Sequence, residues 1–160
     1  MSFGGNKMDP IIKSYLDVLE SLHKDCKKQI SGLTQEELDW SPGEDMNSLG
    51  ILSAHIAGAE RFWMGDYLMG EASGRVRDDE FSTSGSTADA LSKQLDAALK
   101  YSREVFDRLS QDQLGEIRMS PKDDREFTVA WIIASVLRHI ALHLGHMEVT
   151  RQLVKSRSAT

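Results

Sequence analysis

The chain has 160 residues and one cysteine, so its length fits a single domain over residues 1–160 and its composition excludes an internal disulfide. Its formal net charge of -6, with no basic stripe, excludes sequence-independent binding to nucleic acid, because such binding depends on clustered Lys and Arg. The sequence does not open on a signal-peptide pattern, and its longest mostly apolar run, residues 129–137, is too short to cross a bilayer, so we expect a soluble protein with no membrane partner. A chain of this size without a disulfide is typical of a reducing cytoplasm, so we expect it to be cytoplasmic.

The first predicted helix begins after Asp9, a favoured N-cap residue that is followed by Pro10, and it runs to about Gln29. Its apolar residues recur at spacings of three and four, which indicates one buried face: Ile12, Tyr15, Leu19, Leu22 and Cys26. A short turn of helix is expected at residues 34–38.

The second predicted helix begins near Asn47 or Ser48 and ends at Gly70. Residues 71–86 are polar, contain Gly and Ser, and show no periodicity. They predict a long connection, which can cross the whole length of a helical bundle.

A third helix is expected after Ser86 or Thr87, and a fourth over residues 128–155; no segment is predicted to be a strand. Residues 33–38 and 109–114 are weakly alike, so the two halves of the chain show similar plans. The whole pattern predicts an all-α fold, a four-helix bundle with a long crossover between helices two and three.

Histidines replace apolar residues on the inward faces of the second and fourth predicted helices. His55 lies on the first of these faces, and His139 and His143, one turn apart, lie on the other. A buried imidazole without a partner costs about 1–3 kcal/mol, and a metal ion removes that cost. A pair at positions i and i+4 reaches a single ion, as in helix-borne zinc sites, and antiparallel helices bring His143 to the level of His55. We therefore predict a divalent metal ion, zinc or nickel, held by His55, His139 and His143.

Three protein ligands leave coordination positions open, which is typical of a catalytic zinc site. His146 is an alternative ligand to His139; otherwise it faces the substrate or bonds to another helix. In the alternative without a metal, all these histidines are core residues bonded to neighbouring carbonyl groups. A second metal site at His23 and Cys26 is disfavoured, because Cys26 lies on the buried face of its helix.

Two segments carry a resemblance to a known family. Residues 48–63 place His55 before Glu60, Arg61 and aromatic residues, and residues 139–151 hold two histidines, a Gly-His pair and a later Arg. These segments resemble the DinB/YfiT-like superfamily of metal-binding four-helix bundles, near its mycothiol-dependent maleylpyruvate isomerase branch. The resemblance implies the same three histidine ligands. The isomerase branch often has Glu at the position of His139, so the triad is closer to the wider superfamily.

The resemblance also implies transfer chemistry with a low-molecular-weight thiol, whose pKa a metal lowers. We expect a divalent-metal-dependent transferase or isomerase that acts on a small molecule with such a thiol. One alternative is a metal-dependent hydrolase, in which metal-bound water attacks and His146 or Glu60 is the general base. The other alternative is a non-catalytic binding module that the metal stabilises.

Apolar residues remain outside the inner face of the first predicted helix, among them Ile11 and Val18. Bundles of this kind often pair through such an outer face, so we expect an isologous homodimer.

Overall fold

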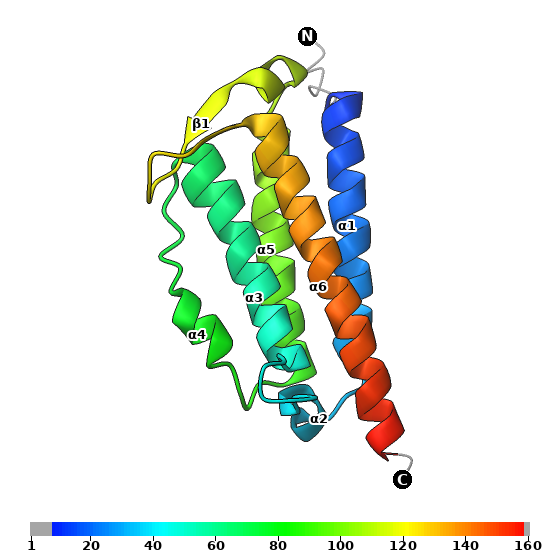
Figure 1. Ribbon diagram of the computed structural model, residues 1–160. Helices are drawn as coiled ribbons and strands as arrows, with labels where there is room; N and C mark the ends of the chain where they lie inside the picture. The colour runs from blue at the N-terminus through cyan, green and yellow to red at the C-terminus, as the bar shows by residue number, and fades with distance from the viewer. Residues whose placement is uncertain (1–7, 159–160) are drawn as a thin grey trace.

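The structure, a computed structural model, describes residues 8–158, so the ends of the expected single domain lie outside the described residues. Four long helices form a bundle, and each of α1 and α3 packs against both α5 and α6. In Figure 1, α1 and α6 run in one direction and α3 and α5 run in the other, so the predicted all-α bundle with a long crossover is confirmed. The bundle helices are α1 (Pro10–Ile30), α3 (Leu49–Arg61), α5 (Ala88–Arg108) and α6 (Val129–Ser158).

The helix starts follow the capping signals in the sequence. The side chain of Asp9 accepts hydrogen bonds from the backbone N–H groups of the first turn of α1, and Thr87 caps α5. The two similar segments both form short helices with capping boxes, in which Thr34 begins α2 (Gln35–Asp39) and Ser110 begins the 3-10 helix η2 (Gln111–Gly115).

The second predicted helix changes its geometry along its length. Ser48 caps α3, which continues at Phe62 into the π-helix η1 (Phe62–Met69). Gly70 ends the run in the left-handed region, with φ of 68°. Both ends agree with the prediction, but periodicity did not reveal the π-helical segment.

Two short features of the structure were not predicted. The crossover contains a helix, α4 (Arg77–Phe81), which packs on α3. The expectation that no segment forms a strand was wrong, because β1 (Ile117–Met119) and β2 (Glu126–Thr128) pair as an antiparallel hairpin before α6. Strands of three residues are too short to show a recognisable alternation of apolar and polar residues.

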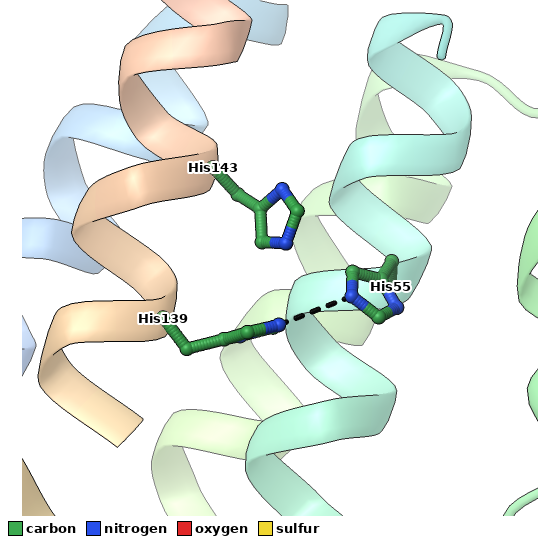
Figure 2. Close-up of side chains that lie close together, drawn as sticks. All are labelled: His55, His139 and His143. Carbon is green, nitrogen blue, oxygen red and sulfur yellow. Dashed lines mark hydrogen bonds between the residues drawn. The ribbon is translucent and has the colours of Figure 1, made fainter. Parts of the chain in front are cut away.

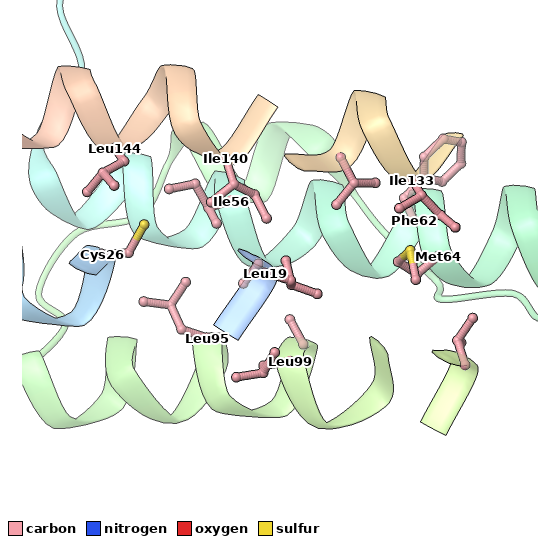
Figure 3. Packing of buried hydrophobic residues seen from close by; sticks show 14 of the residues in the cluster. Leu19, Cys26, Ile56, Phe62, Met64, Leu95, Leu99, Ile133, Ile140 and Leu144 are labelled. Atoms are coloured by element: carbon pink, nitrogen blue, oxygen red, sulfur yellow. The ribbon is translucent and has the colours of Figure 1, made fainter. Parts of the chain in front are cut away.

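The core lies between the four long helices, and every one of them contributes buried apolar side chains. Figure 3 labels some of them: Leu19, Cys26, Ile56, Leu95, Leu99, Ile140 and Leu144.

The segment Val129–Arg157 of α6 is, by length and composition alone, long and apolar enough to cross a membrane. The sequence-based expectation considered only the shorter run of residues 129–137. In the bundle α6 packs against α1 and α3, and core helices of soluble proteins pass the same test, so this is weak evidence for a membrane.

Candidate metal centre

The structure brings together the three histidines that the sequence singled out. His55 on α3 faces His139 and His143 on α6 (Figure 2). One possible ligand atom from each residue lies within 4.8 Å of the others. The Nε2 atoms of His55 and His139 are 3.1 Å apart. His55 is buried and the other two are half-buried, so the cluster lies at the edge of the core.

The hydrogen bonds around this cluster fit a metal ion. Nδ1 of His55 lies 2.9 Å from Oε2 of Glu80. Because a carboxylate accepts hydrogen bonds and cannot donate them, Nδ1 carries a proton, so Nε2, on the side of His139, is the nitrogen of His55 that can bind a metal. Nδ1 of His143 is buried and has no hydrogen-bond partner among the described residues. Three imidazoles whose ring nitrogens converge in this way are a suitable donor set for Zn²⁺ or Ni²⁺.

The surroundings of His139 and His143 favour the neutral form of both imidazole rings. Burial, followed by repulsion from neighbouring histidines, lowers the pKa of His139 and of His143 to about 4. Both rings are therefore neutral at pH 7, which is the form that binds a metal.

Glu80 is a residue of this site that the sequence analysis missed. Burial on its own would raise its pKa, but hydrogen bonds from Arg75 and His55 lower that pKa below its usual value, so Glu80 is a carboxylate. It lies on α4, inside the segment that was expected to be a plain connection. Its approach to His55 depends on the path of the crossover, which no local sequence pattern specifies.

His146 lies beside the cluster. It is exposed, and its ring centroid is 5.4 Å from that of His143. Within residues 8–158 the group close enough to share one ion contains His139 and not His146. His146 instead lines a cavity of about 270 Å³, together with Asp45, Met46, Asn47, Leu52, Val149 and Thr150.

Glu60, the other expected general base, is not at the cluster. It is fully buried, with one carboxylate oxygen 2.5 Å from Nε2 of His23 and the other accepting a hydrogen bond of 2.6 Å from Ser102. These partners lie on α1 and α5, whereas the histidine cluster joins α3 to α6. Both oxygens of Glu60 are already engaged, so the structure gives it a role in joining helices rather than the expected role of general base.

Among the described residues, His23 and Cys26 belong to no group of three or more side chains close enough to share a metal ion. His23 is paired with Glu60, and Cys26 is a buried member of the hydrophobic core.

Solved structures with a similar fold include three bundles of low sequence identity. A DinB-like protein from Bacillus cereus is 16% identical, with a TM-score of 0.73, over 89% of this chain and 92% of its own. YfiT from Bacillus subtilis, described as a probable metal-dependent hydrolase, is 13% identical, with a TM-score of 0.62; the match covers 94% of this chain and 91% of YfiT. A mutant of a mycothiol-dependent maleylpyruvate isomerase is 16% identical, with a TM-score of 0.63; the match covers 85% of this chain and 60% of the isomerase. At these identities the likeness shows the fold.

No curated protein matches the sequence closely enough to add to these comparisons. The mycothiol-S-transferase family model matches residues 14–156, which include all four bundle helices nearly in full and the whole histidine cluster. The chain therefore belongs to the mycothiol-S-transferase family, and its fold is that of the DinB-like and YfiT four-helix bundles.

Proposed function

We propose that this protein is a divalent-metal-dependent transferase or isomerase that acts on a small molecule with a low-molecular-weight thiol. One observation carries the proposal: three imidazoles converge at the edge of the core, beside a cavity. A metal held by three protein ligands keeps positions open for a thiol or a substrate.

His55, His139 and His143 would hold the ion. A bound divalent ion lowers the pKa of a coordinated thiol and so supplies a thiolate nucleophile at neutral pH. The neutral state of His139 and His143 allows them to bind the ion without first losing a proton.

The cavity beside His146 supplies the place for the small molecule. Leu52 and Val149 give it an apolar wall, and Asp45, Asn47 and Thr150 add polar groups that orient a ligand. His146 is exposed at this cavity, where its imidazole can exchange a proton with a bound substrate.

The choice of a thiol is supported by the family and by one structural neighbour. The family model is that of mycothiol-S-transferases, and the maleylpyruvate isomerase with the same fold is mycothiol-dependent. A direct screen can identify the thiol and the electrophile that this chain uses.

The screen starts from protein that has been reconstituted with zinc or nickel. The protein is mixed with mycothiol, bacillithiol or glutathione, and with maleylpyruvate, fosfomycin or an epoxide. We expect turnover that needs both a metal and a thiol and that is lost on chelation and in the His55→Ala variant. Failure with every thiol, in protein that retains its ion, would count against the proposal.

Hydrolysis is the second candidate function, because the same open positions can hold a water whose pKa is lowered toward neutrality. The likeness in fold to YfiT, described as a probable metal-dependent hydrolase, favours testing it. Ester or amide hydrolysis that needs the metal but no thiol would select this alternative. If neither activity is found and His55→Ala removes the ion and lowers the melting temperature, a non-catalytic, metal-stabilised module is the better description.

A further inference from the structure

The crossover between α3 and α5 contacts the histidine cluster through α4, where the ring centroid of Phe81 lies 5.0 Å from that of His55 and Glu80 bonds to the same histidine. Glu80 on α4 is only 7% exposed, whereas its neighbours Asp78 and Asp79 are exposed. Its Oε2 accepts the hydrogen bond from Nδ1 of His55 at 2.9 Å. A buried carboxylate that faces a ligand ring from a separate element is a specific placement, since burial without partners is unfavourable for a charge.

Arg75, which lies before α4, fixes the carboxylate in turn. Its Nε donates to Oε1 of Glu80 at 2.5 Å and its Nη2 donates to Oε2 at 2.8 Å. This two-pronged pairing holds the plane of the carboxylate, and with it the direction in which Glu80 faces His55.

The sequence of α3 leaves room for this contact. Gly58 lies one turn after His55, and a Cβ placed on it would be 2.1 Å from Oε1 of Glu80 and 2.8 Å from its Cδ. Those distances are far below van der Waals contact. Any larger residue at position 58 would therefore displace the carboxylate, which is the flexible end of its side chain, while the packing of the helices can remain.

A carboxylate on Nδ1 has two effects on an imidazole ligand. It selects the tautomer whose Nε2 lone pair is free for a metal, and its charge makes that nitrogen a stronger donor. In metal sites the loss of such a partner typically weakens metal binding about 10–100-fold.

We propose that Glu80 is a positioning residue for the metal ligand His55, so that the crossover is part of the metal site. Arg75 holds the carboxylate of Glu80 in place, and the missing side chain of Gly58 leaves space for it. This inference rests on the proposed metal-dependent function, because it concerns the same ion.

The test measures metal affinity rather than turnover. The full-length protein is stripped with a chelator, and its dissociation constant for Zn²⁺ is found by competition with a chromophoric chelator. We expect Glu80→Gln, which keeps an acceptor but loses the charge, to weaken binding about 10-fold, and Glu80→Leu, which loses both, to weaken it toward 100-fold. Asp78→Asn, an exposed change on the same helix, is the matched control and should bind as the unmodified protein does.

Gly58→Ala provides an independent variant, because it leaves Glu80 in the sequence and only moves its carboxylate. We expect it to weaken Zn²⁺ binding in the same direction as Glu80→Gln, and the Co²⁺-loaded variants to show altered ligand-field absorption. A merely structural role would lower the melting temperature of the metal-free variants and leave affinity and spectrum unchanged.

The outcomes separate this inference from the proposed function. If the unmodified protein binds one ion and both Glu80→Leu and Gly58→Ala bind it equally well, the inference is overturned and the function stands. If the unmodified protein binds no ion, the proposed function and this inference both fall.

Discussion

Each of the three clustered histidines has a defined place in the proposed site, so each can be tested alone. Replacing His55, His139 or His143 by Ala removes one of three ligands. We expect metal affinity to fall by more than about 100-fold, because the loss of a partner outside the ligand shell already costs about 10–100-fold. Elemental analysis after reconstitution and dialysis measures the remaining ion. His146→Ala should keep it, and the reverse pattern, with His146 essential and His139 dispensable, would overturn the ligand assignment.

Cys26 offers a second test, because its chemistry depends on burial. Desolvation, with added repulsion from nearby carboxylates, raises the pKa of its thiol to about 12. The native thiol should therefore resist iodoacetamide at pH 8 and react fully in urea. Labelling of the native and unfolded protein at equal rates would show that Cys26 is accessible.

The raised pKa of the Cys26 thiol also makes the free energy of unfolding depend on pH. The thiol has a higher pKa when folded than its ordinary value near 9, so its contribution is fully present below pH 9 and is lost as the pH rises toward 12. Urea unfolding at pH 8 and pH 10.5 should show a steeper loss of stability in the unmodified protein than in Cys26→Ala.

The sequence predicted the clustered histidines because they lie on regular helices, where spacing alone fixes which residues share a face. The two glutamates of the structure show the limit of this reasoning. Glu60 follows His55 on the same helix and was a candidate general base that the sequence alone could not place; in the structure it joins His23 to Ser102. Glu80 was missed because it reaches His55 by a tertiary path.

At the scale of elements, the helices with strong local signals were predicted well, the short α2 among them, whereas α4 and the two strands were not. Caps such as Asp9 and Ser48 act within one turn, so they can be recognised without tertiary information. The helix α4 and the strands β1 and β2 are three to five residues long, and contacts with the bundle stabilise them. The change to π-helix at Phe62 has no recognisable local signal either.

Gly70, which ends η1, allows the contribution of a single helix end to be measured. Its φ of 68° is strained for any residue with a Cβ, yet a Cβ there would meet nothing within 4 Å. Gly70→Ala should therefore destabilise the protein by about 1 kcal/mol, through the backbone alone. Urea unfolding measures this difference. Gly115→Ala, with equal space and no positive φ, is the control and should cost less; an equal cost at both positions would argue against backbone strain.

At the scale of the whole molecule, the outer surface of α1 is where we expect two copies of the chain to meet. Ile11 and Val18 lie seven residues apart on that helix and are 41% and 49% exposed. We propose that they contribute to an isologous homodimer, in which one surface patch meets its own copy. Light scattering at micromolar protein should give twice the mass of 17.9 kDa, and Val18→Asp should reduce it to one chain. A monomeric mass for the unmodified protein would refute the dimer.

The proposed metal centre joins α3 to α6, two helices that are far apart in the sequence, so an ion bound there should stabilise the whole bundle. A ligand that binds only the folded state adds about 2.7 kcal/mol at a free concentration of 100 times its dissociation constant. For a chain of 160 residues, each kcal/mol raises the melting temperature by about 2–4 °C. Chelation should therefore lower the melting temperature by roughly 5–10 °C from its value under that metal concentration.

Calorimetry with chelator and with added zinc measures this difference in melting temperature. His55→Ala is the control, because its melting temperature should be the same in both conditions. An equal rise in the variant would place the stabilising ion elsewhere, and no rise in unmodified protein that holds one ion would mean that the unfolded chain binds it as well.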